Sequence, residues 1–145
     1  MIDSRTAPYA ATLLRLALGA MWISHGLLKL LVFTPAGLAG FLGSLGLPAV
    51  LAWPMIVAEI GGGVLILIGL YGRQASVLLL PILLGASWVH AGNGWVFSAA
   101  NGGWEYPVFL LAASLAHVLL GDGAYALKAT DRLVPAARPV LNPAS

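Results

Sequence analysis

The chain contains no cysteine and few charges. Its absence of cysteine excludes disulfides, thiolate metal ligands and thiol relays within this chain. Lys, Arg, Asp and Glu make up 8% of the 145 residues, whereas a soluble domain carries about 25%. With 60% hydrophobic residues and a mean hydropathy of +0.94, most of the chain is expected to lie in lipid. The net charge of +2 is small and dispersed, so nucleic-acid binding is not expected, and no nucleotide-binding glycine pattern is present.

Four apolar stretches are candidate membrane spans. They cover about residues 10–31, 49–71, 75–91 and 104–121. A helix needs ~17–25 residues to cross a bilayer, so the last two are near the lower limit. Lipid offers the backbone no hydrogen-bonding partners, so each stretch is expected to be helical. The short connections predict an all-α integral membrane protein, an antiparallel bundle of four transmembrane helices formed by residues 10–128.

The basic residues outside the spans indicate the orientation. They precede the first span, separate the second from the third and follow the fourth: Arg5, Arg73, Lys128, Arg132 and Arg138. The connections 32–48 and 91–103 contain neither Lys nor Arg. By the positive-inside rule, the N-terminus (1–9) and the Pro-containing tail (129–145) are expected in the cytoplasm.

The first connection carries a helical pattern. Thr34-Pro35 resembles a helix start, with Thr as the cap and Pro at the first helical position. Apolar residues then follow at helical spacing: Leu38, Phe41, Leu42 and Leu45. This pattern predicts a short amphipathic helix over about residues 35–46 on the non-cytoplasmic surface. A hydrophobic loop packed over the bundle is the alternative.

Seven titratable side chains lie within the spans or at their ends: Arg15, His25, Lys29, Glu59, His90, Glu105 and His117. An ionisable group inside a bilayer costs ~2.5–3.5 kcal/mol unless it is paired or reaches water, so these are the candidate functional residues. In the first span, Arg15, Trp22 and Lys29 are spaced seven apart. They share a stripe with Gly19 and Gly26, which is expected to face the bundle interior.

Glu59 is expected at middle depth and must be protonated or paired. A rise of ~1.5 Å per residue places it roughly 15 Å below the outer end of its span, with Arg15 below it and His25 and Lys29 above. Two interpretations stay open. Glu59 could pair with Arg15 and fasten two helices together, or it could act in catalysis or proton transfer with His25 or Lys29.

On the outer side, His25, Lys29, His90 and Glu105 are expected at similar depth, which predicts a shared pocket. Alternatively, His90 bonds to a backbone carbonyl, and Glu105 interacts favourably with a helix N-terminus. His117 lies ~18 Å deeper than Glu105. It is expected to be a hydrogen-bonded core residue or part of a second ligand site. Two histidines and a carboxylate could bind metal, but no short histidine spacing supports this, and metal is not expected.

Several segments together resemble the DoxX family over about residues 10–128. They are Arg15-Leu-Ala-Leu-Gly-Ala, His25-Gly-Leu-Leu-Lys29-Leu, Gly43-Ser-Leu-Gly-Leu-Pro48, the run from Glu59 to Arg73, His90, Glu105 and Gly121-Asp-Gly-Ala-Tyr125. The resemblance implies a four-helix protein of the bacterial cytoplasmic membrane. Some relatives form the membrane part of a thiosulfate:quinone oxidoreductase. The family is also similar in fold to quinone-linked thiol oxidoreductases, whose cysteines this chain lacks.

These observations favour a membrane subunit of a quinone-linked oxidoreductase acting on sulfur compounds or in related redox chemistry. Glu59 and His25 would deliver protons, while Lys29 and Arg15 would stabilise a developing anion. The substrate-binding residues would be Trp22, Trp88, His90, Trp104 and Glu105. Lipid, a quinone, a redox partner protein and further copies of the chain are the expected partners. The alternatives are a non-enzymatic scaffold or small-solute carrier and, more weakly, a copper or haem site at the outer face using His25 and His90.

Overall fold

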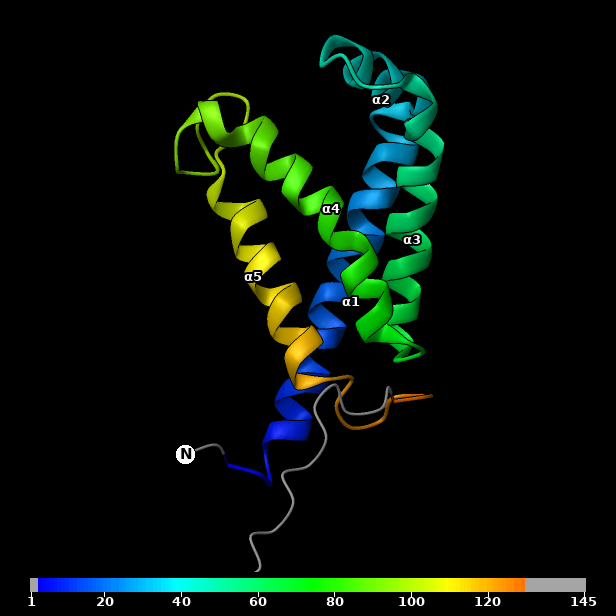
Figure 1. Ribbon diagram of the computed structural model, residues 1–145, viewed down its shortest axis with the longest axis vertical. Helices are drawn as coiled ribbons and strands as arrows, with labels where there is room; N and C mark the ends of the chain where they lie inside the picture. Colours follow the sequence, from blue (N-terminus) through cyan, green and yellow to red (C-terminus); the bar gives the residue numbers. More distant parts are fainter. Residues whose placement is uncertain (1–2, 130–145) are drawn as a thin grey trace, which may run out of the picture.

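The computed structural model describes residues 3–129, which form five α-helices and two short 3-10 helices (Figure 1). The elements are α1 (Ala7–Leu31), α2 (Thr34–Ser44), η1 (Ala49–Leu51), α3 (Ala52–Ile68), α4 (Gly72–His90), η2 (Ala91–Asn93) and α5 (Glu105–Leu120). No β-strand occurs within residues 3–129, although Leu70 and Lys128 form an isolated bridge. The all-α prediction is confirmed.

Within residues 3–129, three segments are long and apolar enough to cross a membrane: Ala7–Leu31, Ala49–Ile68 and Gly72–Asn93. The fourth predicted span corresponds to α5, a shorter apolar helix. The predicted boundary between the second and third spans was displaced by three residues. Helix α3 ends at Ile68 because Gly69 adopts the left-handed conformation with φ 68°, and α4 already begins at Gly72.

Helices α1 and α3 pack closely through glycine. A Cβ atom added at Gly19 would lie 2.8 Å from the Leu67 Cα, and one at Gly63 would lie 2.9 Å from the Ile23 backbone nitrogen. Such distances leave no room for a side chain. The predicted inward stripe of α1 is confirmed as far as Gly26, since the buried residues are Ala11, Arg15, Leu18, Gly19, Trp22 and Gly26. Lys29, which was predicted on the same stripe, is half-buried.

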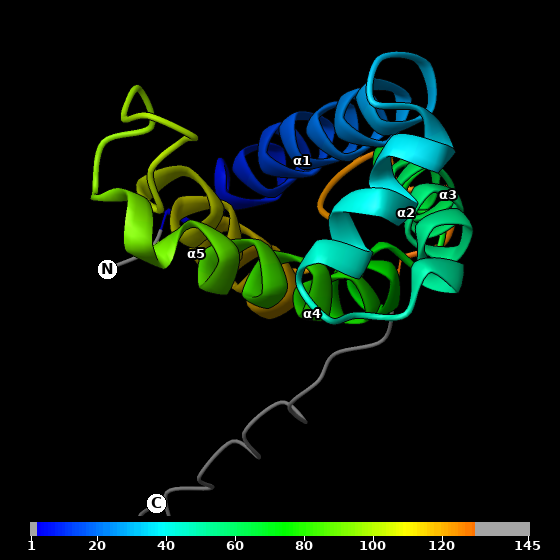
Figure 2. The same cartoon turned by 90° about the horizontal axis from the view of Figure 1, so that it is seen from above.

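Helices α4 and α5 pack together and lean away from α1 and α3 towards the end at which α2 lies (Figure 1). Figure 2 shows α2 lying over that end of the bundle. The main hydrophobic core joins α1, α3, α4 and α5 at Leu18, Trp22, Ile66, Ala75, Leu79, Leu83 and Leu110. A second core lies beneath α2 and comprises Leu38, Leu42, Ala52 and Ile56.

The predicted helix in the first connection is present as α2. Thr34 is its first residue, with φ 63°, and the Thr34 hydroxyl accepts a hydrogen bond from the Gly37 N–H at 3.2 Å. This bond satisfies a backbone donor that the first turn leaves open. Leu38 and Leu42 are buried, whereas Phe41 is exposed. The face of α2 that carries Leu38 and Leu42 therefore packs on the bundle.

The segment after α5 folds back across the end of the bundle opposite α2. The Leu127 N–H donates to the Ile68 carbonyl at 3.1 Å, and the Lys128 N–H donates to the Gly69 carbonyl at 2.9 Å. The Ala124 N–H donates to the Pro8 carbonyl at 3.1 Å. Residues 121–128 thus connect α5 with α1 and α3, and we call them the C-terminal strap. The predicted cytoplasmic tail lies outside the described residues except for Ala129.

Candidate functional site between the two helix pairs

A cavity of about 730 Å³ lies between the α1–α3 pair and the α4–α5 pair, on the side covered by α2. Its wall consists mostly of Leu, Met, Phe and Trp side chains contributed by all five α-helices. The polar or titratable residues in the wall are His25, Lys29, Glu59, His90, Asn101 and Tyr106. A large apolar cavity with a few convergent polar groups is typical of a small-molecule site.

Lys29 and Glu59 form an ion pair in this wall, between Lys29 Nζ and Glu59 Oε1. The Lys29 side chain is 22% exposed and the Glu59 side chain is 0% exposed. The pair joins α1 to α3. Of the two open interpretations, the structure therefore has Glu59 paired with Lys29, near the α2 end of α1, rather than with Arg15.

Two buried polar atoms that belong to residues of the cavity wall have no hydrogen-bond partner among the described residues. They are Glu59 Oε2, an acceptor, and Trp22 Nε1, a donor. A buried polar group without a partner costs about 1–3 kcal/mol. Two residues of the cavity wall thus carry one acceptor and one donor that the described residues leave unsatisfied.

His25 is held in a defined orientation. Its Nδ1 lies 3.0 Å from the Met21 carbonyl oxygen, and its ring stacks on Tyr106 with centroids 5.7 Å apart and planes 21° apart. Nδ1 must carry a proton to bond a carbonyl, so Nε2 of the neutral ring is an acceptor. When the ring is protonated, Nε2 becomes a donor.

His90 also lies in the wall, but its ring is bound to the connection before α5. His90 Nδ1 is 3.1 Å from the Asn101 carbonyl oxygen and 3.0 Å from that of Gly102. The Asn93 side-chain amide donates to the same two carbonyls. His90 therefore corresponds to the alternative in which it bonds to backbone carbonyls, and it shapes the cavity rim.

Three predicted site residues lie outside the cavity wall: Arg15, Trp104 and Glu105. Trp104 packs edge-on against Trp95, with centroids 4.4 Å apart. Glu105 Oε1 accepts the Phe97 N–H at 2.9 Å. Both side chains therefore stabilise the connection between α4 and α5. The prediction that Glu105 contributes to a shared pocket was wrong. Glu105 is the first residue of α5, and its carboxylate bonds the connection between α4 and α5 instead.

Arg15 lies at the opposite end of the bundle. Its Nη2 is 3.5 Å from the Ala124 and Tyr125 carbonyl oxygens in the C-terminal strap. Along α1, the 14 residues from Arg15 to Lys29 span roughly 21 Å, so Arg15 cannot share the Glu59 site. The predicted role of Arg15 beside Glu59 is therefore corrected.

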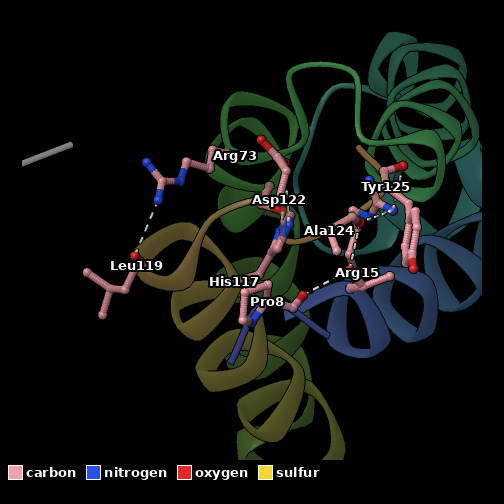
Figure 3. Close-up of polar contacts among 10 residues, drawn as sticks. Pro8, Arg15, Arg73, His117, Leu119, Asp122, Ala124 and Tyr125 are labelled. Atoms are coloured by element: carbon pink, nitrogen blue, oxygen red, sulfur yellow. Dashed lines mark hydrogen bonds and ion pairs between the residues drawn. The ribbon is translucent and has the colours of Figure 1, made fainter. Parts of the chain in front are cut away.

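A second polar cluster surrounds His117 at this opposite end (Figure 3). Ser76 Oγ is 2.8 Å from His117 Nδ1, and Asp122 Oδ1 is 3.6 Å from His117 Nε2. His117 is thus confirmed as a hydrogen-bonded core residue. Arg73 Nη2 donates to the Leu119 carbonyl at 3.4 Å.

Sequence reasoning did not select Ser76, Tyr106 or Asp122 as site residues. Asp122 falls within the segment Gly121-Asp-Gly-Ala-Tyr125 that contributes to the family resemblance, and this was the available signal. Ser76 and Tyr106 carry no comparable signal, because each is a common residue at the end of an apolar stretch. In residues 3–129, no group of three or more His, Cys, Asp or Glu side chains is arranged to hold a metal ion.

Comparison with known proteins identifies the family. The DoxX family profile matches residues 10–92. This chain belongs to the DoxX family. Together with its three long apolar helices, this makes it a membrane protein.

Two relatives of this DoxX protein are informative. An "Uncharacterized protein" of Haemophilus influenzae is 34% identical over 122 residues, covering 83% of this chain and 89% of the relative. The "Putative oxidoreductase CatD" of Bacillus subtilis is 39% identical over 77 residues, covering 51% of this chain and 54% of the relative. No solved structure matches the chain.

Proposed function

We propose that this DoxX protein crosses the bacterial inner membrane four times, with both termini in the cytoplasm. The fourth crossing would be α5, whose 16 residues extend roughly 24 Å, somewhat less than a hydrocarbon core of about 30 Å. The distribution of Lys and Arg supports this orientation. The cavity would then open in the outer half of the membrane, beneath α2.

Within this arrangement, the cavity is a binding site for a quinone, and the protein is the membrane subunit of a quinone-linked oxidoreductase. The observation that carries the proposal is the apolar cavity of about 730 Å³. Its wall residues include Trp22 and Glu59, whose buried Nε1 and Oε2 atoms have no partner among the described residues. A quinone combines an apolar ring and tail with carbonyl oxygens that need donors. The printed name of the Bacillus relative is consistent with redox chemistry.

Each polar group has a defined part in this site. The Trp22 N–H would bind one carbonyl oxygen of the ring, and Trp88 would cover part of the apolar wall. His25 accepts or donates a proton at Nε2, because its Nδ1 is fixed to the Met21 carbonyl. Glu59 takes up a proton at Oε2 and delivers it to a carbonyl oxygen of the ring, and Lys29 stabilises negative charge that develops nearby.

A bound quinone would take up two electrons and two protons. The protein's own residues supply protons but no electrons. The electrons therefore come from a reduced sulfur compound or from a redox partner protein. A water-soluble analogue with the same ring can test the site without that donor.

The test measures binding of decylubiquinone to the full chain in nanodiscs. Binding is detected as quenching of tryptophan fluorescence. His25→Ala removes the ring that can donate at Nε2 and should weaken quinone binding roughly three- to tenfold. Glu59→Gln should weaken binding of decylubiquinol, whose hydroxyl donates to the carboxylate, roughly tenfold or more, and should weaken binding of the quinone much less. Trp22→Phe keeps the ring but loses the N–H and should weaken binding roughly three- to tenfold. Glu105→Gln is the matched control, because that carboxylate lies outside the cavity wall.

Equal affinity in wild type and all variants would remove the cavity from consideration as a quinone site. In that case the Lys29–Glu59 pair would serve to fasten α1 to α3. A non-enzymatic scaffold or a solute carrier would then be the better description. A quinone that copurifies with wild type, and that is present in a smaller amount in the lipid extract of Glu59→Gln, would support the proposed site independently.

A further inference from the structure

Some residues that line the large cavity are also exposed on the surface of the protein. Leu47, Leu51 and Trp88 line the cavity and are 40%, 38% and 64% exposed. A residue that borders a cavity and is also exposed marks a place where the cavity reaches the surface. Leu47 and Leu51 precede α3, whereas Trp88 lies near the end of α4, so the two edges of an opening belong to these two helices.

One ridge of α4 forms the first edge. Leu78, Pro81, Gly85 and Trp88 are spaced three or four residues apart, so they follow one face of the helix. All four are exposed. Leu78 is 76% exposed and does not line the cavity, so it contacts lipid when α4 crosses the membrane. The other three line the cavity, and the lipid-facing ridge of α4 therefore continues into the cavity wall.

Gly85 leaves empty space on this ridge. A Cβ atom added at Gly85 would meet nothing within 4 Å, although the residue lines the cavity. Gly61 on α3 is also exposed and has the same empty space, but it does not line the cavity. The two glycines thus form a matched pair, of which only Gly85 borders the opening.

The second edge belongs to η1 and α3. Leu51, Met55 and Glu59 are four residues apart and line the cavity, so they form one stripe. Along this stripe the residues change from exposed at Leu51 to fully buried at Glu59. The cavity therefore leads without interruption from its surface edge to the residue of the Lys29–Glu59 pair.

The two edges separate above a tight contact. A Cβ atom at Gly62 would lie 2.8 Å from Leu79 Cδ1, so α3 and α4 pack closely at that level. Towards α2 the two helices diverge (Figure 1), and both line the cavity there. On the other side of the cavity, between α1 and α5, the His25 ring stacks on Tyr106, so side chains of those two helices meet.

The rim of the opening is apolar, since Leu47, Leu51, Pro81 and Trp88 all lack a charged group. Apolar surface is unfavourable in water, whereas the acyl chains of a bilayer are as apolar as leucine. The composition of the rim therefore favours an opening onto lipid over an opening onto water.

We propose that the cavity opens sideways onto the bilayer between α3 and α4, and that Gly85 is a specificity-determining residue that leaves room for the tail of a lipid-soluble ligand. This inference rests on the proposed function, in which the quinone ring lies near Glu59 and Trp22. The tail runs past Met55 and Gly85 into the acyl chains. The ligand class is a quinone with a long apolar tail that arrives by diffusion within the membrane.

The first measurement needs no quinone. The chain contains no cysteine, so Gly85→Cys and Gly61→Cys each provide a single site for a nitroxide spin label in the full chain in nanodiscs. Power-saturation EPR then measures collisions of the label with oxygen, which concentrates in lipid, and with a water-soluble nickel chelate. Both labels should collide with oxygen and be protected from nickel.

The second measurement compares the affinities of decylubiquinone and of the benzoquinone that has the same ring without the tail. Gly85→Phe should weaken decylubiquinone binding roughly tenfold, because the phenyl group takes the place of the tail, and should leave the affinity of the tail-less quinone unchanged. Gly85→Ala adds a single methyl group and should have a smaller effect than Gly85→Phe. Gly61→Phe is the matched control and should leave both affinities unchanged.

All affinities are compared in one lipid composition, so the partition of the tail into lipid is the same for every variant. The helical circular dichroism signal confirms that each variant is folded. Because a Cβ atom at Gly85 meets nothing within 4 Å, Gly85→Phe should fold like Gly61→Phe.

Three results would overturn the inference. Collision of the Gly85→Cys label with nickel would show that the cavity opens onto water. Equal weakening of both quinones in Gly85→Phe would mean that Gly85 borders the ring, and unchanged decylubiquinone affinity would leave the opening to the acyl chains of the bilayer. Wild type that binds neither quinone would instead refute the proposed function, while the two collision rates would still decide whether the cavity opens onto lipid.

Discussion

Replacing Lys29 with Met should destabilise the protein more than replacing Glu59 with Gln, although both changes break the same ion pair. The two side chains differ in exposure, 22% for Lys29 and 0% for Glu59. Without the ammonium group, the carboxylate is left fully buried. Without the carboxylate, the ammonium group can still reach water at the end of its flexible stem.

The expected magnitudes follow from this asymmetry. Removing one partner of a buried pair and leaving the other charge buried costs about 3–5 kcal/mol, and we expect Lys29→Met in this range. Glu59→Gln should cost about 1.5 kcal/mol, the low end for losing a hydrogen bond to a charged group. The double variant Lys29→Met/Glu59→Gln should be within about 2 kcal/mol of wild type, because it leaves no unpaired charge buried.

The assay is reversible unfolding in mixed micelles with an increasing fraction of SDS. Unfolding is monitored by the loss of the helical circular dichroism signal. Free energies of unfolding for the four proteins form a double-mutant cycle. Two results would refute the reasoning. One is a Lys29→Met protein as stable as Glu59→Gln. The other is a double variant destabilised by the sum of its parent variants, which would mean that Glu59 does not depend on Lys29.

Three further predictions concern packing and the loops. Gly63→Ala should lower the free energy of unfolding in mixed micelles by about 1–3 kcal/mol, since its Cβ would lie 2.9 Å from the α1 backbone. The control is Gly61→Ala, whose Cβ would have no atom within 4 Å and which should be neutral or stabilising. Equal losses of stability in the two variants would contradict the close packing of α1 and α3. Gly72→Ala should speed amide hydrogen exchange in residues 121–128, because the added Cβ displaces the Asp122 carboxylate; exchange unchanged from wild type would count against that contact. His90→Ala should speed exchange in residues 94–104 with little change in global stability, since the ring bonds the Asn101 and Gly102 carbonyls; a global loss of stability would instead assign His90 to the core.

Much of the helical framework was predictable from local pattern. The inward stripe of α1 follows from seven-residue spacing, and its glycines indicate a close neighbour, which is α3. The helix after Thr34 follows from a cap, a proline and apolar spacing. The end of α3 was placed three residues too late, because the apolar run continues past Gly69 while the backbone turns there.

The composition of the candidate site was only partly predictable. Depth along a helix follows from a rise of ~1.5 Å per residue, so Glu59, His25 and Lys29 could be assigned to one region. The same rule left Arg15 and Lys29 as equal candidates for Glu59, because both side chains are long. It also could not predict that Asp122, in a glycine-rich turn after α5, lies beside His117.

Composition and local periodicity were enough to predict the main helical segments, the buried face of α1 and the presence of titratable groups within apolar segments. The three-dimensional arrangement was needed to see that Lys29 pairs with Glu59, that Arg15 contacts the C-terminal strap and that Ser76 and Asp122 lie beside His117. These contacts depend on the divergence of α4 and α5 from α1 and α3 and on turns with positive φ at glycine. Neither the mutual tilt of helices nor the path of a flexible turn is encoded in the periodicity of any single segment.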